Sequence, residues 1–485
     1  MNPGTTMLDK SKPGKRAYTL PLSGVDMIDP GSVLPSALLR SGPVGLPEVS
    51  EPEIARHFIN LSRLNHHVDK DFYPLGSCTM KYNPKVGGYA SALPGFSRLH
   101  PMTPSGLTQG ALAVIYELGR ALCEITGMDD ITMAPAAGAH GELTGMLMVR
   151  AYHAARGPLR KKVLIPDSAH GTNPASVTAA GYESVEVPSG ADGRIDPGEL
   201  KPFLNDDVAA VMITNPNTLG LFETHIREVA ELIHGVGGLV YMDGANMNAL
   251  LGISRPGDFG VDIVHLNLHK TFSTPHGGGG PGAGPVAVKR EMIPFLPVPY
   301  VIREGDLESG FTYRLAWDRG SSIGRIHTFY GSFAVMVRAY CYVMMMGPGG
   351  LRRVAEDAIL NANYLMSRLV RKYHMPYGGI CKHEFVASGK NFLSNGVRTN
   401  DIAKRLMDYG FHPPTVYFPL IVEEALMIEP TETESKHTLD GFAEALNRIS
   451  EEIESDPELV RGAPYDTPVR RVDEAGAARS LDVAQ

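Results

Sequence analysis

The chain has 485 residues, of which 43% are hydrophobic and 20% charged, and its formal net charge is −8. This length predicts a large core divided between domains, in a soluble globular protein. An acidic chain without a basic stripe argues against a nucleic-acid partner. No apolar run reaches the length that crosses a bilayer, so no membrane association is expected. Four scattered cysteines without metal-ligand spacing favour a reducing cytoplasm, and no metal site is expected.

The first part of the chain, residues 1–95, is rich in proline and glycine and predicts an extended N-terminal arm that packs on another surface. One short helix is expected in it, over Glu51–Leu64. Between Ala111 and Ile125, apolar residues recur at spacings of three and four, which predicts a longer helix. Gly127 is typical of its end.

Residues 96–346 are predicted to form a large domain in which short apolar strands alternate with amphipathic helices such as Arg227–His234. This pattern indicates an α/β fold with a mainly parallel sheet flanked by helices on both faces. In such sheets, ligands bind beyond the carboxyl ends of the strands. Strands are expected at Lys162–Pro166, Ala209–Thr214, Gly238–Met242, Asp262–Leu268 and Pro285–Lys289.

A second, smaller α/β domain is expected over residues 347–455. The glycine- and proline-rich start of this range, Gly347–Gly350, predicts a hinge. Helices are expected near Leu351–Tyr373 and Asp401–Tyr409. The charged segment 456–485 is expected to form a loose surface tail.

The most informative segment is His269-Lys270, which ends the apolar run from Ile263 and precedes a glycine-dense loop at Thr274–Gly284. A lysine at a strand end, beside a loop that lets backbone approach a ligand closely, is suited to hold an aldehyde cofactor as a Schiff base. The cofactor that fits is pyridoxal 5'-phosphate, bound as a Schiff base to Lys270, with His269 placed to contact its phosphate. A surface lysine is the ordinary alternative, but an apolar strand and four consecutive glycines are a poor setting for one. The loop fits neither dinucleotide nor P-loop spacing, so a nucleotide site is disfavoured.

A phosphate site is predicted where small residues enter a helical run after Met133. The amides of Gly138, Ala139 and His140 are expected to face the cofactor phosphate, because helix N-termini present free N–H groups. The alternative is an ordinary tight loop before a core helix.

The cofactor ring needs a carboxylate at its nitrogen and a flat group on each face. Asp243, at the end of an apolar strand, is the expected carboxylate, and Ala245 is small enough to lie against one ring face. His170 is expected to stack on the other face, and Asn217 or Thr218 to bond the ring hydroxyl. Each residue also has a plain alternative: a helix N-cap for Asp243, a loop histidine for His170, and a simple turn for Asn217. Their joint occurrence before the lysine, each at a strand end, is more specific than any one of them.

This order of motifs resembles the fold-type I pyridoxal phosphate enzymes, especially their amino-acid decarboxylase branch. Longer stretches resemble one family within that branch, the P-protein of the glycine cleavage system, and the resemblance runs from about Ser62 to Thr433. The stretches are Tyr73–Asn83, Ser168–Ser176, Met242–Asn248 and Leu266–Phe272.

The resemblance carries expectations about assembly. P-proteins occur as one long chain with two homologous halves or as two separate subunits. This chain has the length of one half and carries the lysine motif, so it is similar to the catalytic subunit of the two-subunit form. The implied partners are a subunit 1, in an α2β2 heterotetramer, and the lipoyl-bearing H-protein.

The reaction implied is decarboxylation of glycine, with transfer of the remaining aminomethyl group to the lipoyl arm of H-protein. Lys270, His170 and Asp243 are the expected catalytic residues. The Tyr73–Asn83 segment is expected to reach the substrate side of the pocket, or else to pack on the partner subunit. Arg325, beside His327, is left open between binding a carboxylate, lining the lipoyl entrance and forming a structural ion pair. Two alternative functions are a non-catalytic scaffold subunit of the same complex and another pyridoxal phosphate decarboxylase.

Overall fold

The computed structural model describes residues 6–277 and 280–481, and the chain divides into two compact units. The first unit is drawn from Met1–His67 and Asp466–Gln485. In it, α2 begins with a capping box, in which Glu53 accepts from the backbone N–H of Ser50 at 2.9 Å. The helix expected from Glu51 is therefore present and ends at Ser62. The elements of this unit are α1 (Pro30–Val33), η1 (Ser36–Leu38), α2 (Glu51–Ser62) and α14 (Glu474–Arg479).

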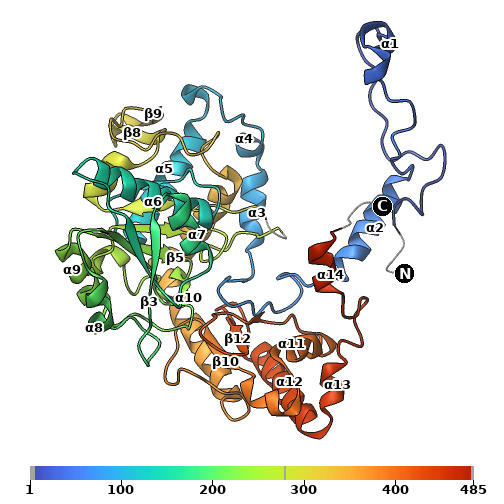
Figure 1. The fold of residues 1–485 in the computed structure, drawn as a ribbon. Coiled ribbons are helices and arrows are strands. Elements are labelled where there is room, and N and C mark those ends of the chain that lie inside the picture. The colour runs from blue at the N-terminus through green and yellow to red at the C-terminus, as the bar shows by residue number, and fades with distance from the viewer. Residues whose placement is uncertain (1–5, 278–279, 482–485) are drawn as a thin grey trace. The chain divides into compact units, whose positions relative to one another are not determined.

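The second unit, Val68–Tyr465, is built on a seven-stranded sheet of order β1-β7-β6-β5-β4-β2-β3 (Figure 1). Strands β3, β2, β4, β5 and β6 are parallel, whereas β7 is antiparallel to β6 and to β1. The predicted mainly parallel sheet is confirmed. The strands are β1 (Asp130–Thr132), β2 (Lys162–Pro166), β3 (Glu183–Val187), β4 (Val208–Thr214), β5 (Leu239–Gly244), β6 (Ile263–Leu266) and β7 (Val286–Val288).

Helices cover both faces of this sheet, because alternate side chains of each buried strand point to opposite faces. Val211 and Ile213 of β4 join one core, and Ala210 and Met212 join the other. The first core includes side chains of α5, α9 and α10, and the second includes those of α6 and α7. These helices are α5 (Gln109–Thr126), α6 (Gly138–Ala154), α7 (Thr172–Ala179), α9 (Ile226–Gly235) and α10 (Phe333–Leu369).

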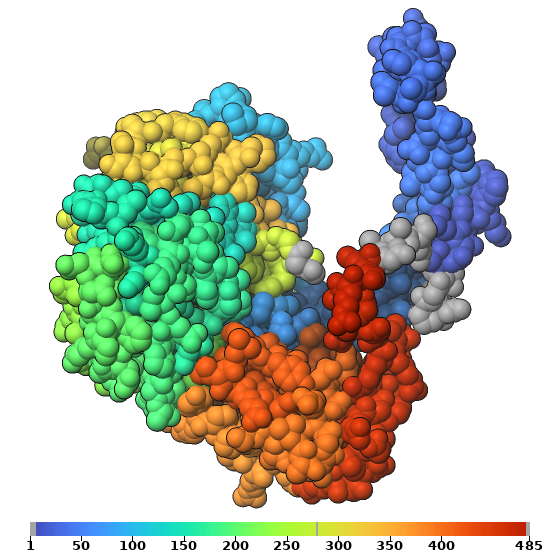
Figure 2. Space-filling model, viewed as in Figure 1, coloured from blue at the N-terminus to red at the C-terminus, as the bar shows by residue number. Residues whose placement is uncertain are grey.

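Shorter elements complete this part of the chain. An antiparallel hairpin, β8–β9, packs against α5 and η2 and forms part of the outer surface (Figure 2). The short elements are α3 (Lys85–Ala92), α4 (Pro94–Ser97), η2 (Ser105–Leu107), α8 (Pro197–Leu200), η3 (Lys201–Phe203), η4 (Met247–Ala249), η5 (Pro256–Phe259), η6 (Arg290–Phe295), β8 (Tyr300–Asp306) and β9 (Gly310–Ala316).

A kink divides the long helix α10 at the position where the sequence predicts a hinge. Gly347 has φ 59° and ψ −179°, a conformation that favours glycine, and Pro348 follows it. Before the kink, Met336 and Ala339 pack in the core of the large sheet. Well after it, Leu365 packs in a separate core. One helix thus links the two cores.

The second core belongs to a smaller three-stranded antiparallel sheet, of order β10-β12-β11, covered by helices. Helix α13 packs there too, through the buried Val460, although the sequence placed 456–485 in a surface tail. The domain limits drawn from the sequence stay a prediction. The elements are β10 (Phe385–Ser388), η7 (Lys390–Asn395), α11 (Thr399–Asp408), β11 (Thr415–Val416), β12 (Ala425–Ile428), α12 (Lys436–Ser455) and α13 (Pro457–Arg461).

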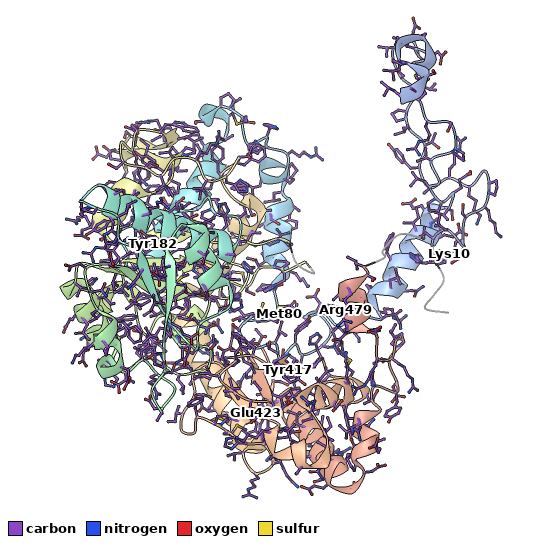
Figure 3. The ribbon with its side chains drawn as sticks, in the orientation of Figure 1. Lys10, Met80, Tyr182, Tyr417, Glu423 and Arg479 are labelled. Carbon is purple, nitrogen blue, oxygen red and sulfur yellow. The ribbon has the colours of Figure 1, made fainter. Side chains whose placement is uncertain are left out.

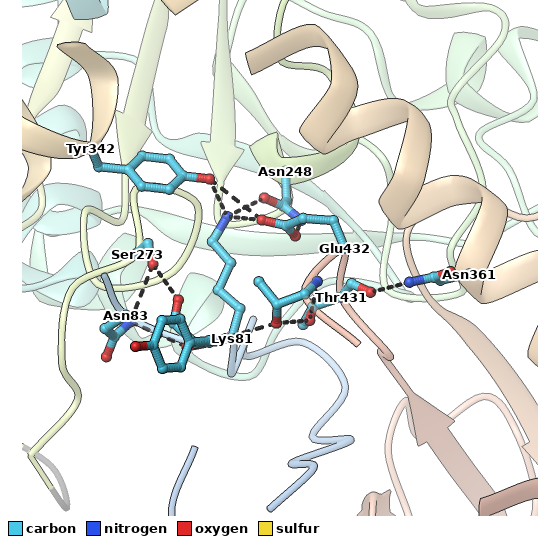
Figure 4. Close-up of polar contacts among 10 residues, drawn as sticks. Lys81, Asn83, Asn248, Ser273, Tyr342, Asn361, Thr431 and Glu432 are labelled. Atoms are coloured by element: carbon cyan, nitrogen blue, oxygen red, sulfur yellow. Dashed lines mark hydrogen bonds and ion pairs between the residues drawn. The ribbon is translucent and has the colours of Figure 1, made fainter. Parts of the chain in front are cut away.

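The segment Tyr73–Asn83 contacts the smaller sheet through Gly76 and the turn that carries Lys270 through Ser77. Figure 3 shows Met80 on this segment, with Tyr417 and Glu423 in the smaller domain. The next residue, Lys81, is buried, and its Nζ donates to Asn248, Tyr342 and Glu432 at 2.9, 3.1 and 2.7 Å (Figure 4). Burial lowers the pKa of Lys81, but the charges of Glu432 and Tyr342 and the hydrogen bonds to them together outweigh burial, so the pKa lies above its ordinary value. This buried ion pair fixes the segment between the two domains.

Candidate active site

A cavity of about 190 Å³ opens beyond the carboxyl ends of the parallel strands. Most of the residues predicted from the sequence line it, and others join them from β4, β6, α7 and the Tyr73–Asn83 segment. The lining residues are Ser77, Gly138, Ala139, Glu142, His170, Thr172, Thr214, Thr218, Asp243, Ala245, His265, Asn267, His269 and Lys270.

Lys270 lies four residues beyond the end of β6, in a turn where its backbone N–H donates to Asn267 O at 3.0 Å. Its Nζ donates to the carbonyl oxygen of Ser77 at 2.8 Å. The segment expected to reach the pocket therefore does so at Ser77. The cofactor lysine predicted from the sequence has its amino group in the cavity, beside a backbone acceptor from a distant part of the chain.

His269 lines the same cavity in its neutral form. Burial, followed by the charges of His276 and Lys270, lowers its pKa to about 3. Its Nδ1 accepts from the backbone N–H of Ala283 at 3.4 Å. With Nδ1 as the acceptor, the neutral ring carries its proton on Nε2, which lies 3.5 Å from Asn267 Nδ2. Two glycines of the glycine-dense loop, 278 and 279, lie outside the described residues, so the close approach of this loop's backbone to a ligand stays a prediction.

Asp243, near the end of β5, is buried and remains strongly acidic. Its Oδ1 accepts from the backbone N–H of Ala245 at 2.9 Å and lies 3.3 Å from His265 Nε2. Burial raises the pKa of Asp243, but the charges of His265, Lys270 and His170 and the hydrogen bond from Ala245 N–H together outweigh it, so the pKa lies below its ordinary value. Tyr241 contacts His265 Nδ1 at 2.7 Å and fixes its ring. The site therefore presents an ionised carboxylate to whatever fills the cavity.

His170 is oriented by a chain of hydrogen bonds. Its Nδ1 lies 2.9 Å from Thr172 Oγ1, which donates to Glu142 at 2.8 Å. The ring also packs edge-on to Phe418, with ring centroids 5.6 Å apart. Burial, followed by the charge of Lys270, lowers the pKa of His170. The ring is thus neutral, fixed and at the cavity wall, as stacking requires.

The start of α6 forms a cradle of backbone at one end of the cavity. A Cβ added at Gly138 would lie 2.4 Å from Asn267 Nδ2, so any other residue there would displace the Asn267 side chain. Gly138 and Ala139 line the cavity, whereas His140 does not appear in its lining. The Nδ1 of His140 accepts from Ala136 N–H at 3.2 Å, and burial lowers its pKa. The His140 ring therefore contacts the start of α6 and also lies 5.9 Å, between ring centroids, from His327.

The structure distinguishes the two residues considered for the ring hydroxyl. Thr218 lines the cavity, and its hydroxyl donates to Ser168 O. The Asn217 amide lies outside the lining and donates to Gly193 O and Glu223, both at 2.8 Å. Thr218 is therefore the better placed of the two.

Several lining residues were missed by the sequence reasoning. His265 and Asn267 alternate along the apolar run that precedes Lys270, and this two-residue spacing was a usable signal. Thr214 ends β4 at the same edge of the sheet, and its buried hydroxyl has no partner among the described residues. Glu142 lies on the second turn of α6, a position that only the folded structure brings to the cavity.

Arg325 and His327 lie at a separate, open pocket of about 530 Å³. Arg325 donates to the backbone oxygens of His327 and Thr328, at 3.2 and 2.5 Å. Its guanidinium also lies over the Trp317 ring, 5.5 Å from its centroid. These backbone and ring contacts fix the Arg325 side chain. Whether Arg325 binds a carboxylate or lines the lipoyl entrance stays a prediction.

The cavity suits an aldehyde cofactor with an aromatic ring and a phosphate. Lys270 supplies an amine and Asp243 an ionised carboxylate, and the start of α6, which has no side-chain cap, lines the cavity through Gly138 and Ala139. Thr214 adds an unpartnered buried hydroxyl. An acid and a helix N-terminus in the same cavity as the lysine match the chemistry of such a cofactor.

The fold and this site define a fold-type I pyridoxal phosphate enzyme. Residues 31–385 match the family described as glycine cleavage system P-protein, and residues 354–463 match the glycine dehydrogenase C-terminal domain. The chain belongs to the glycine cleavage system P-protein family, and pyridoxal phosphate is its cofactor.

Curated relatives match over nearly the whole chain. A probable glycine dehydrogenase (decarboxylating) subunit 2 of Chlorobium chlorochromatii (strain CaD3) is 58% identical, over 98% of both chains. The protein of the same description from Caldanaerobacter subterraneus subsp. tengcongensis is 57% identical, over 98% of this chain and 97% of its own. Because the alignments cover 98% of this chain, the similarity includes the N-terminal arm.

Solved structures agree on the fold. A glycine decarboxylase (P-protein) of the glycine cleavage system, in inhibitor-bound form, aligns with a TM-score of 0.74 at 23% identity and covers 86% of this chain and 94% of its own. A Lactobacillus brevis glutamate decarboxylase aligns with a TM-score of 0.63 at 14% identity, covering 87% and 96%. The predicted fold class is thus confirmed.

Proposed function

We propose that this chain is the catalytic subunit of a two-subunit glycine dehydrogenase (decarboxylating) in the glycine cleavage system. It decarboxylates glycine and passes the aminomethyl group to the lipoyl arm of H-protein. The observation that carries the proposal is the meeting of Lys270 and Asp243 in one cavity, in a chain 58% identical to a probable subunit 2.

The balance of the reaction defines what the site must do. The bond between the glycine α-carbon and its carboxyl group breaks and releases carbon dioxide. The α-carbon then forms a bond to one lipoyl sulfur, the lipoyl disulfide breaks, and the second sulfur takes up a proton. The cofactor, when bound, supplies an electron sink for the pair left on the α-carbon.

Residues of this chain would bind the cofactor and keep its ring in the protonated form that accepts the electron pair. Lys270 would hold the cofactor covalently until glycine takes its place, and the Ser77 carbonyl would accept a hydrogen bond from the released amine. Ionised Asp243 would keep the ring nitrogen protonated, with His265 supporting its charge. His170 would stack on one ring face and Ala245 lie on the other.

The phosphate would lie at the start of α6. The amides of Gly138, Ala139 and His140 would bind it there, and neutral His269 would donate a further hydrogen bond. Thr218, better placed than Asn217, would bond the ring hydroxyl. Together these contacts would orient the ring between His170 and Ala245.

A subunit 1 partner is part of the proposal, in an α2β2 heterotetramer. The first unit supports this, because its side chains expose much apolar surface, and large exposed apolar patches mark protein interfaces. Leu22 and Met27 are 99% and 86% exposed, and Leu20, Val25 and Ile28 are also exposed. Within residues 6–277 and 280–481, no helix is long and apolar enough to span a membrane. A cytoplasmic location is proposed because the structure describes all four cysteines and each is a free thiol.

The test uses the chain co-purified with subunit 1. Lys270→Ala should abolish the visible absorbance of the lysine-bound cofactor and the exchange of carbon between glycine and bicarbonate. Asp243→Asn should retain cofactor and decarboxylate far more slowly. A Lys270→Ala enzyme that keeps both signals would refute the assignment.

The rival functions differ in what they require. Another pyridoxal phosphate decarboxylase would act on its own amino acid without H-protein, whereas glycine exchange here should depend on H-protein. A scaffold subunit would show neither cofactor absorbance nor exchange. The lysine and carboxylate in one cavity favour the catalytic role over the scaffold.

A further inference from the structure

The Ser77 peptide joins Lys270 to a buried acid of the smaller domain. The backbone N–H of Ser77 donates to Glu384 Oε2 at 2.7 Å, and its carbonyl accepts from Lys270 Nζ at 2.8 Å. Ser77 has φ 63°, in the left-handed region that residues with a side chain rarely adopt. Such a conformation persists where surrounding contacts hold it.

The residue before Ser77 is also fixed to the smaller domain. The N–H of Gly76 donates to Met427 O at 3.2 Å, and its carbonyl accepts from Thr415 Oγ1 at 2.8 Å. A Cβ on Gly76 would lie 2.6 Å from Met427 O, so only glycine permits this approach. Gly76, which precedes the Ser77 peptide that contacts Lys270, is therefore hydrogen-bonded to both β11 and β12.

Glu384 is buried and held from two sides. Its Oε2 accepts from Ser77 N–H, and its Oε1 accepts from Asn246 Nδ2 at 3.1 Å. Ligand atoms of His383, Glu384 and Glu429 lie within 4.8 Å of one another, close enough to hold a cation. Because both Glu384 oxygens already accept N–H bonds, the geometry favours a role in holding backbone over metal binding. Burial and the nearby charge of Glu429 raise the pKa of Glu384 well above its ordinary value, which favours the neutral form of the acid.

We propose that Glu384 is a positioning residue for Lys270. It holds the Ser77 peptide in the left-handed conformation, and the Ser77 carbonyl in turn holds the Lys270 amino group at the cavity. The smaller domain thus sets the position of the cofactor lysine of the larger domain. This inference rests on the proposed function, in which Lys270 holds the cofactor, and adds the contact that orients that lysine.

Two substitutions of Glu384 separate this role from a role for its charge. Glu384→Gln keeps an oxygen for Ser77 N–H and resembles the neutral acid; it loses only the Asn246 bond, and Asn246 still donates to Pro216 O at 2.9 Å. Glu384→Asp keeps an ionisable group but is one methylene too short to reach both donors. If Glu384 positions Lys270, the Glu384→Gln variant should retain function and the Glu384→Asp variant should lose it. If the negative charge of Glu384 matters instead, the two results should be reversed.

A matched control comes from Glu424, another buried glutamate of the smaller domain. Its Oε2 accepts from Thr399 N–H, also at 2.7 Å, and this bond does not lead to Lys270. Glu424→Asp shortens the same kind of backbone contact. It should lower stability without changing the cofactor site.

The experiment measures two properties of the complex with subunit 1. One is the affinity of the cofactor-free complex for pyridoxal phosphate, and the other is the pH midpoint of the visible absorbance of bound cofactor without glycine. Glu384→Asp should weaken affinity at least tenfold and move the midpoint. Glu384→Gln should stay within about threefold with an unmoved midpoint, and Glu424→Asp should match the parent in both.

Three results would overturn the inference. They are a Glu384→Asp complex that matches the parent, a Glu384→Gln complex that loses as much as Glu384→Asp, and a Glu424→Asp complex that shifts as far as Glu384→Asp. Lys270→Ala is measured first. If that variant keeps the visible absorbance, the proposed function itself fails. If it loses the absorbance and the Glu384 variants still match the parent, only the positioning role fails.

Discussion

Replacing Lys81 by methionine removes one partner of the buried ion pair and keeps a side chain of similar length. The Lys81 side chain is 1% exposed and that of Glu432 is 9% exposed. After the change, Glu432 keeps a bond from Asn248 at 3.1 Å and a long one from Tyr342 at 3.4 Å. Breaking a buried pair by removing one partner costs about 3–5 kcal/mol, because the other charge is left without compensation.

The measurement is equilibrium unfolding in urea with pyridoxal phosphate at a fixed saturating concentration, because a bound ligand shifts apparent stability. Lys85→Met is the matched control, since its ion pair with Asp69 is exposed. It should cost less than about 1 kcal/mol, as surface pairs do. The double variant Lys81→Met/Glu432→Gln should recover part of the loss, because it also removes the stranded charge. A Lys81→Met protein as stable as its Lys85→Met counterpart would refute the reasoning.

Two further predictions concern Gly138 at the cavity and the buried acid Glu429. Gly138→Ala places a methyl group 2.4 Å from Asn267 Nδ2 and should weaken pyridoxal phosphate binding at least tenfold, about 1.4 kcal/mol, in an absorbance titration. Gly171→Ala, whose methyl group meets open space, should bind normally, and equal affinities would contradict the cradle. Burial raises the pKa of Glu429 to about 8, so the folded protein keeps a proton that the unfolded chain releases above about 4.5, and stability falls as pH rises through this window. The Glu429→Gln variant has no such group, so its stability does not fall in this way. The free energy of unfolding of the variant minus that of the parent should therefore rise by up to about 1.4 kcal/mol per pH unit between pH 5 and 8. A difference that does not change with pH would count against the raised pKa.

The parallel strands and the cofactor lysine could be predicted from local patterns. A short, unbroken apolar run such as Ala209–Thr214 is typical of a buried strand in a parallel sheet. The edge strand β3 was missed because two exposed residues, Glu183 and Glu186, break its apolar run. The smaller sheet was also missed, because its strands are short and antiparallel, and their partners lie far apart in the sequence.

The sequence by itself determined the class of fold, the cofactor and the place of Lys270. Each of these depends on the order of residues within one short segment, or on strand ends that a parallel sheet must bring to one edge. The tertiary structure alone decided what surrounds that lysine. Ser77 and Glu384 are separated from Lys270 by more than a hundred residues and carry no local signal, because their contacts depend on how the two domains pack around the Tyr73–Asn83 segment.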